Sequence, residues 1–211
     1  MKAAAGSRDE RRRGPLSFLR ELPGVIFIAF LLALVIKSFL VQAFYIPSSS
    51  MENTLLIGDR VLVNKMVYRF REPRRGDVIV FENPKHVEPD RNPLRDLWDW
   101  ITEGLGVSSD PEKDYIKRII ALPGETFAYR QGKVFIDGKR LYEPYLNPQP
   151  DLRDHGPVTI AEGEYFVMGD NRANSSDSRY ELGPIRRRDI VGRAFVILWP
   201  PGRLGWLGIA T

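Results

Sequence analysis

The hydrophobic residues of this chain are concentrated in one segment near the N-terminus. Residues 24–36 carry no charge, and after Lys37 the apolar character resumes from Phe39 to Ile46. About 20 helical residues, each rising roughly 1.5 Å, cover a hydrocarbon core of roughly 30 Å. We therefore expect one transmembrane helix over 23–44, with the Lys37 ammonium reaching the interface. A cleavable signal peptide is the alternative, but its apolar run would be shorter and would end at small residues.

The residues before this segment predict its orientation. Residues 1–22 are polar and carry more basic than acidic side chains. Because basic residues flanking a membrane helix are retained in the cytoplasm, we expect a disordered cytoplasmic tail. Residues 45–211 would then lie on the outer face of the cytoplasmic membrane.

Beyond residue 51 the pattern changes to the alternation and short apolar runs of β-strands. Residues 83–114 interrupt it with a Pro- and acid-rich insertion, whose apolar residues three and four apart predict a short amphipathic helix. The chain is thus expected to be mainly β, with strands at 60–65, 78–81, 115–122, 164–168 and 193–198, and a hairpin with an Asp-Gly turn at 134–141.

Composition narrows the chemistry. The absence of cysteine excludes thiolate catalysis, disulfides and cysteine zinc sites, and only His86 and His155 could contribute imidazole to a metal site. We therefore expect no metal and no cofactor. The net charge of +4 is modest and lies partly in the N-terminal tail, so we expect attraction to a membrane surface and no nucleic-acid binding.

A row of serines at 48–50 directly after the apolar segment is a candidate nucleophile site. Both histidines lie in Pro- and charge-rich stretches typical of surface loops, which leaves Lys117 as the better candidate base. A free lysine has a pKa of about 10.4, but burial in an apolar site lowers it by several units. Strand alternation sends Lys117 and Arg118 to opposite faces, so one is expected to be buried. The spacing alone fits an exposed lysine on an edge strand equally well.

The blocks at 46–55, 58–65, 115–124 and 169–179, in this order behind an apolar segment, resemble bacterial signal peptidase I. The resemblance covers the chain from about residue 20 to about residue 200. It implies an antiparallel β catalytic domain over 45–211, with a small inserted β subdomain at about 125–160.

Transferred to this chain, the family pattern implies that Ser50 is the nucleophile and Lys117 its general base. The Ser48 hydroxyl and the Ser50 backbone N–H would form the oxyanion hole. Ser175 would hydrogen-bond to Lys117 and orient it.

The same resemblance implies that Asp177 and Arg179 form a buried ion pair that stabilises the polar loop at 169–179. It also implies shallow apolar pockets for small substrate residues, which would be lined by Phe44, Ile46, Met51, Leu55, Val61, Tyr115 and Ile116.

Three residues depart from the family pattern, which usually has glycine at the position of Ser49 and commonly has proline at that of Asn53 and aspartate at that of Ala173. If residue 49 needs a positive φ, serine would be strained there by at most about a few kcal/mol. None of the three removes a group that the mechanism uses.

The resemblance predicts a membrane-bound serine endopeptidase that removes signal peptides from exported preproteins after small residues, at sites of the Ala-X-Ala type. Its partners would be these preproteins and membrane lipid, and we expect a monomer. Two alternatives are a repressor-type Ser-Lys autoprotease, which would need a DNA-binding helical domain, and a non-catalytic membrane-tethered β scaffold whose serines cap a helix.

Overall fold

The computed structural model describes residues 22–30, 32, 40–83, 114–146, 149–180 and 182–208. The N-terminal tail expected at 1–22 and the amphipathic helix expected within 83–114 lie outside the described residues, except at their edges.

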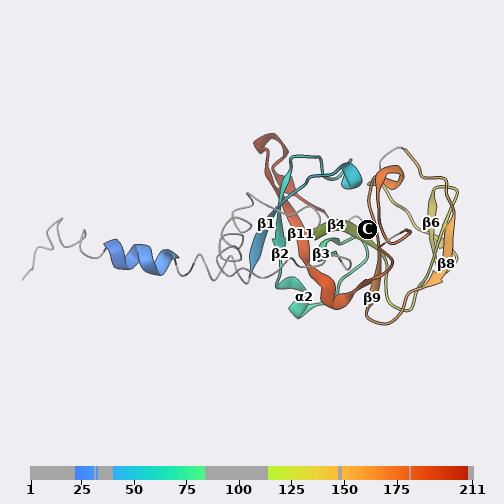
Figure 1. Cartoon of the computed structure of the whole chain (residues 1–211), viewed down its shortest axis with the longest axis horizontal. Helices are drawn as coiled ribbons and strands as arrows, with labels where there is room; N and C mark the ends of the chain where they lie inside the picture. Colours follow the sequence, from blue (N-terminus) through green and yellow to red (C-terminus); the bar gives the residue numbers. More distant parts are fainter. Residues whose placement is uncertain are drawn as a thin grey trace, which may run out of the picture.

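The larger of two β-sheets contains the strands on both sides of the candidate nucleophile. Its strands follow the order β1-β2-β11-β3-β4-β9-β10, with β12 paired to β11, and every pairing is antiparallel (Figure 1). The bounds are Val41–Tyr45 for β1, Arg60–Asn64 for β2, Val78–Glu82 for β3, Asp114–Ala121 for β4, Glu164–Met168 for β9, Ile185–Arg186 for β10, Ile190–Trp199 for β11 and Gly205–Trp206 for β12.

A second, four-stranded antiparallel sheet is formed by the chain between β4 and β9, in the order β7-β6-β5-β8. Its strands are Thr126–Arg130 (β5), Lys133–Ile136 (β6), Lys139–Arg140 (β7) and His155–Thr159 (β8). The described helices near or within the two sheets are short: η1 Ser49–Met51, α2 Val67–Phe70, η2 Arg172–Asn174, η3 Arg187–Asp189 and η4 Pro201–Arg203. The mainly antiparallel β prediction, the five predicted strands and the hairpin are confirmed.

The N-terminal apolar segment ends differently from the prediction. Residues 22–30 are helical, but residues 41–45 form β1, so the predicted continuation of the helix to residue 44 is wrong. In β1 the Phe44 side chain is buried and Tyr45 is exposed, and the backbone pairs with β2, Phe44 lying opposite Val61. An apolar run of this length fits a buried strand as well as a helix, and tertiary pairing decides between them. None of the helices in the described residues is both long and apolar enough to cross a bilayer.

The two sheets share a hydrophobic core. Ile120 of β4 and Phe166 of β9 belong to the same buried cluster as Phe127 and Tyr129 of β5. The rings of Phe127 and Phe166 are stacked with centroids 4.0 Å apart. The second sheet is therefore packed against the strand that carries Lys117.

The turn between β6 and β7 adopts a left-handed backbone conformation. Asp137 and Gly138 have φ angles of 50° and 77°, the left-handed pair that a type I′ hairpin turn requires. A Cβ on Gly138 would meet no atom within 4 Å, so Gly138→Ala should destabilise the fold by about 1 kcal/mol through backbone strain alone. Denaturant unfolding would measure the change.

The matched control is Gly202→Ala, because a Cβ there also meets open space and its φ is not positive. This variant should unfold at the wild-type denaturant concentration or slightly above it, because alanine without strain lowers the entropy of the unfolded chain. Equal midpoints for Gly138→Ala and wild type would contradict the predicted strain.

Candidate active site

Ser50 lies in η1, in the loop that connects β1 to β2. The loop is closed at its base because Ile46 N–H donates to the Asp59 carbonyl oxygen and Gly58 N–H to that of Ile46, each at 2.9 Å. The fully buried side chains of Met51 and Leu55 hold the loop against the core of the large sheet. Ser50 itself is only 7% exposed.

Lys117 approaches Ser50 from β4, which lies between β3 and β9. Its amine donates to Ser50 Oγ at 2.8 Å and to the Ile116 carbonyl oxygen at 3.0 Å. Both Lys117 and its neighbour Arg118 are buried, although only one of them was expected to be. The fold thus brings together two residues that are 67 positions apart in the sequence.

Desolvation controls the protonation of Lys117. Burial lowers the pKa of its amine from 10.5 to about 8, against the opposing attraction of the Asp177 and Asp170 carboxylates. Each carboxylate forms a buried ion pair with an arginine, Asp177 with Arg179 and Asp170 with Arg118. The neutral amine, which a general base requires, is therefore far more populated near neutral pH than in a free lysine.

The other groups considered for the chemistry are Ser48 and the two histidines. The Ser48 and Ser50 hydroxyl oxygens are 3.3 Å apart. His155 lies on β8, where its ring is tilted against those of Phe127 and Phe166. His86 is outside the described residues.

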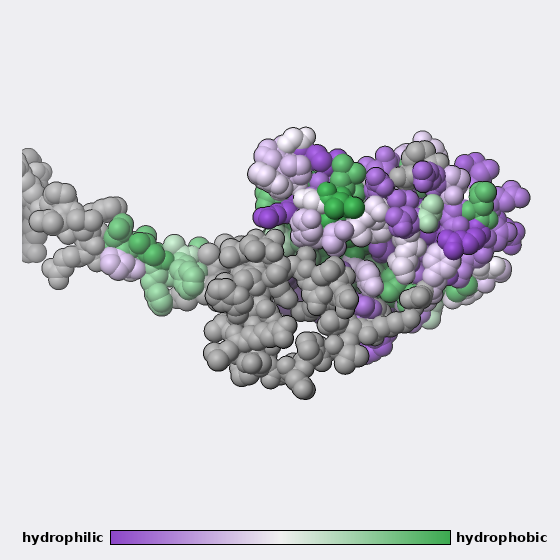
Figure 2. Space-filling model, turned by 45° about the horizontal axis from the view of Figure 1, so that its top comes forward, coloured by the Kyte–Doolittle hydropathy of each residue, from purple (hydrophilic) through white to green (hydrophobic). Residues whose placement is uncertain are grey.

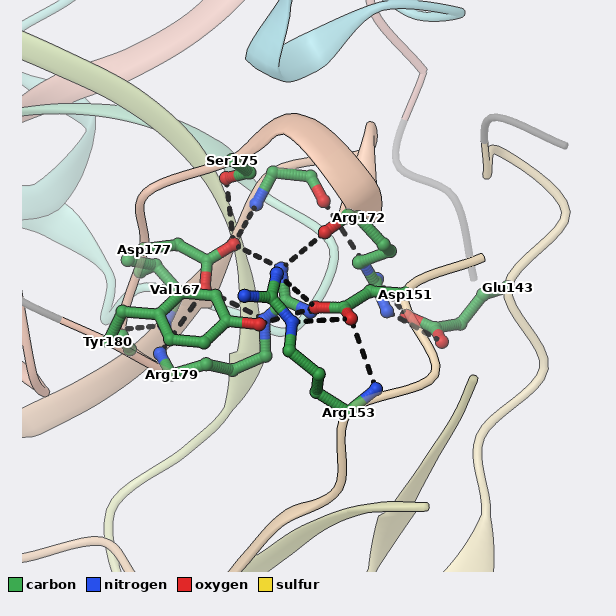
Figure 3. Close-up of polar contacts among 11 residues, drawn as sticks. Glu143, Asp151, Arg153, Val167, Arg172, Ser175, Asp177, Arg179 and Tyr180 are labelled. Carbon is green, nitrogen blue, oxygen red and sulfur yellow. Dashed lines mark hydrogen bonds and ion pairs between the residues drawn. The ribbon is translucent and has the colours of Figure 1, made fainter. Parts of the chain in front are cut away.

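The polar loop after β9 is centred on the Asp177 carboxylate (Figure 3). This carboxylate accepts hydrogen bonds from Gly169 N–H at 3.1 Å, Ser175 Oγ at 2.7 Å and Arg179 Nε at 2.9 Å. Arg179 also donates to Asp151 Oδ2 at 2.8 Å. Burial raises the pKa of the Asp151 carboxyl, but hydrogen bonds from Arg153 and Tyr180 and the charge of Arg179 outweigh it and hold that pKa well below its usual range. Asp177 and Arg179 are fully buried at their side chains, so the pair lies inside the protein.

Ser175 has a different partner from the one expected. Its hydroxyl donates to Asp177, whereas the hydrogen bonds of Lys117 among the described residues go to Ser50 and Ile116. Ser175 nevertheless lies close to the β1–β2 loop that carries Ser50. A Cβ on Gly169 would come within 2.3 Å of Ser175 Oγ and 2.4 Å of the Ser50 carbonyl oxygen, so only glycine permits this approach.

A second buried ion pair, not predicted from the sequence, lies beside the candidate base. Arg118 donates to both oxygens of Asp170, at 2.9 and 2.7 Å, and its guanidinium lies 3.9 Å from the Tyr145 ring centroid. Thr54 Oγ1 donates to the same carboxylate at 2.5 Å. The adjacent cations at 117 and 118 were the available signal, but their partners are far away in the sequence.

The predicted pocket residues fall into two groups. Tyr115 packs in a separate cluster with Ile79 and Phe81, and its ring centroid lies 5.6 Å from Lys117 Nζ. One hydrophobic cluster below the nucleophile loop contains the other six, namely Phe44, Ile46, Met51, Leu55, Val61 and Ile116.

The structure also describes the three residues that depart from the family pattern. Ser49 is not among the non-glycine residues with positive φ in the described residues, so the strain considered for it does not arise. Asn53 has φ 89°, which proline, fixed near about −65°, could not adopt. Its side chain donates to the carbonyl oxygens of Tyr145 and Leu146, at 2.9 and 3.2 Å. Ala173 is exposed in η2.

Comparison with known proteins gives a consistent result over most of the chain. The sequence model of the family described as "Signal peptidase, peptidase S26" matches residues 19–199. The probable signal peptidase I-2 of Synechocystis sp. is 41% identical over 187 residues, which cover 89% of this chain and 76% of the relative.

Two further relatives are named signal peptidase I. Signal peptidase I of Leptolyngbya laminosa is 42% identical over 183 residues, which cover 87% of this chain and 81% of the relative. Signal peptidase I of Mycobacterium tuberculosis is 35% identical over 233 residues, covering 95% and 79% respectively.

Proposed function

This chain belongs to the peptidase S26 family of signal peptidases, and on that basis we propose that Ser50 and Lys117 are its catalytic residues. As a family member it is a serine endopeptidase that cleaves signal peptides. The non-catalytic scaffold is thereby excluded, and the match over residues 19–199 favours a signal peptidase over a repressor-type autoprotease. The observation that carries the proposed dyad is the 2.8 Å contact between the buried Lys117 amine and Ser50 Oγ.

In the proposed mechanism the neutral Lys117 amine takes the hydroxyl proton as Ser50 Oγ attacks the carbonyl carbon of the scissile peptide bond. The Ser48 hydroxyl and the Ser50 N–H stabilise the oxyanion. The lysine cation then protonates the leaving amine, and the acyl-enzyme is formed. The Lys117 amine then takes a proton from water as the water oxygen attacks the ester carbon. The ester bond breaks, and the lysine cation gives this proton to Ser50 Oγ. These steps use only groups of the chain and water.

The apolar cluster below the nucleophile loop supports a preference for small substrate residues. We propose that these almost entirely buried side chains form the floor of shallow pockets beside Ser50, which would accept alanine-sized groups. Sites of the Ala-X-Ala type in exported preproteins match this expectation. Tyr115 would then contribute on the side of the base, and not within the apolar cluster.

Exposed apolar side chains support a position against lipid. Figure 2 shows the helix over residues 22–30 mainly in green and, separately, a group of green residues on the largely polar surface of the folded part. Arg203 joins the loop after Ser50 to the β11–β12 hairpin by donating to Asp59 Oδ1 at 2.9 Å and to the Thr54 carbonyl oxygen at 3.1 Å. On these two joined segments the exposed large apolar side chains are Leu56, Ile57, Leu198, Trp199, Leu204 and Trp206.

We infer that this surface rests on the outer leaflet of the cytoplasmic membrane. Tryptophans are enriched at membrane interfaces, where an apolar ring with a polar N–H is favoured. The apolar segment before β1 would anchor the chain with its basic N-terminal tail in the cytoplasm. The catalytic domain would then meet preproteins at the bilayer surface, as a monomer.

The dyad is tested by substitution. Ser50→Ala and Lys117→Met should each lower kcat for a preprotein by at least about 10³-fold, because the residual rate comes only from binding and the oxyanion hole. Gel analysis of preprotein cleavage by the full-length enzyme would measure it. The controls Ser176→Ala and Lys139→Met alter an exposed serine of the polar loop and an exposed lysine of β7, and should cleave normally. Substantial turnover by either dyad variant would reject the assignment.

The pH dependence follows from the lowered pKa of Lys117. The neutral amine is the active form, so kcat should increase with pH through a midpoint of about 8 and level off above it. Initial rates from about pH 6 to about pH 10 would define this midpoint. A midpoint near the ordinary lysine value of 10.5 would show that the base is not desolvated.

Contact with lipid is tested by fluorescence quenching. In vesicles whose acyl chains carry bromine, the tryptophan emission of the full-length enzyme should be quenched, relative to unbrominated vesicles. The quenched fraction should decrease in the variant Trp199→Phe/Trp206→Phe, since these side chains are exposed on the proposed lipid-facing surface. An unchanged quenched fraction would place this surface away from the bilayer.

A further inference from the structure

Asn171, in the polar loop after β9, holds the backbone on both sides of the proposed nucleophile. Its backbone N–H donates to the Ser50 carbonyl oxygen at 3.0 Å. Its side-chain Nδ2 donates to the Ser49 carbonyl oxygen at 3.1 Å and to Glu52 Oε2 at 3.2 Å. The residue is 5% exposed, so these contacts are formed inside the protein.

The contact with Ser49 has a geometric consequence. The peptide group between Ser49 and Ser50 is planar and trans, so its C=O and its N–H point in opposite directions. The Ser49 carbonyl oxygen accepts from Asn171 Nδ2 and also from Glu52 N–H at 3.0 Å. Two donors that fix this oxygen therefore also fix the direction of the Ser50 N–H.

We propose that Asn171 is the positioning residue of the oxyanion hole, because its side-chain amide sets the direction of the Ser50 N–H through the 49–50 peptide group. This proposal rests on the proposed function, in which that N–H stabilises the oxyanion. Donors of an oxyanion hole are effective because they already point to where the charge develops. Asn171 would act without touching the substrate.

The polar atoms of Asn171 argue against a purely stabilising role. Its Oδ1 is buried and has no hydrogen-bond partner in the part of the chain that the structure describes. An unpaired buried acceptor is unfavourable for folding, so stability alone does not account for this side chain. What the amide does provide is the Nδ2 donor, which is directed at the nucleophile segment.

The same loop offers a matched control. Asn174 Nδ2 donates to Ser49 Oγ at 2.7 Å, so Asn174 and Asn171 contact the same residue. Asn174 holds the Ser49 hydroxyl, and Asn171 holds its carbonyl oxygen. Only the second contact constrains the peptide plane.

The test compares Asn171→Ala, Asn171→Leu and Asn174→Ala in the full-length enzyme. Asn171→Leu keeps the approximate shape of the side chain and the backbone hydrogen bond, but it has no donor for the Ser49 carbonyl oxygen and adds no charge beside the Glu52 carboxylate. Both Asn171 variants should lower kcat by about 10-fold to about 100-fold, less than the loss of an oxyanion donor itself. The KM and the midpoint of the pH profile should stay at their wild-type values, and Asn174→Ala should keep the wild-type kcat.

The pH midpoint separates positioning from general disruption. A disordered site would hydrate Lys117 and raise its pKa, so the midpoint would move up together with the loss of kcat. Wild-type kcat in Asn171→Leu, a change in KM alone, or a shifted midpoint would each overturn the proposal. If instead Ser50→Ala or Lys117→Met remains active, the proposed dyad fails, and this is measured separately from the Asn171 variants.

Discussion

The proposed catalytic site depends on the removal of one amine from water. Lys117 is surrounded by the strands of the large sheet and by the nucleophile loop, and its burial outweighs the two carboxylates that would otherwise keep it charged. Those carboxylates are each bound to an arginine, and both ion pairs are buried. The surrounding charges are thus satisfied by one another, which leaves desolvation as the dominant influence on the pKa of the Lys117 amine.

The arrangement of strands places this amine beside a hydroxyl. β4 lies inside the sheet, where both neighbouring strands exclude water, whereas the serine is in a loop closed by β1 and β2 at the edge. The polar loop after β9 joins the two by contacting both segments. Asn171 holds the serine backbone, and Asp177 fixes Ser175 and the Gly169 amide close to it. A short-range contact is therefore built from three distant parts of the chain.

Much of this could be predicted from the sequence, because local patterns carried the information. Alternation identified the strands, and the Asp-Gly pair identified the hairpin. The spacing around Lys117 left burial and exposure equally open, and its proposed role came from the resemblance to a known family. The N-terminal helix was predicted too long, since an apolar run does not distinguish a membrane helix from a strand that pairs with β2. The partners of Ser175 and Arg118 were also missed, because hydrogen-bond choice between distant groups is decided by packing and not by composition.

Arg203 links the position of the apolar β11–β12 hairpin to the position of Ser50. By binding Asp59 and the Thr54 carbonyl oxygen, it connects the β11–β12 hairpin to the β1–β2 loop that carries Ser50. With the hairpin seated on lipid, the height of the Ser50 hydroxyl above the bilayer would be fixed by protein geometry and not by thermal motion of the domain. The enzyme would then cleave the peptide bond that a membrane-embedded segment presents at that height.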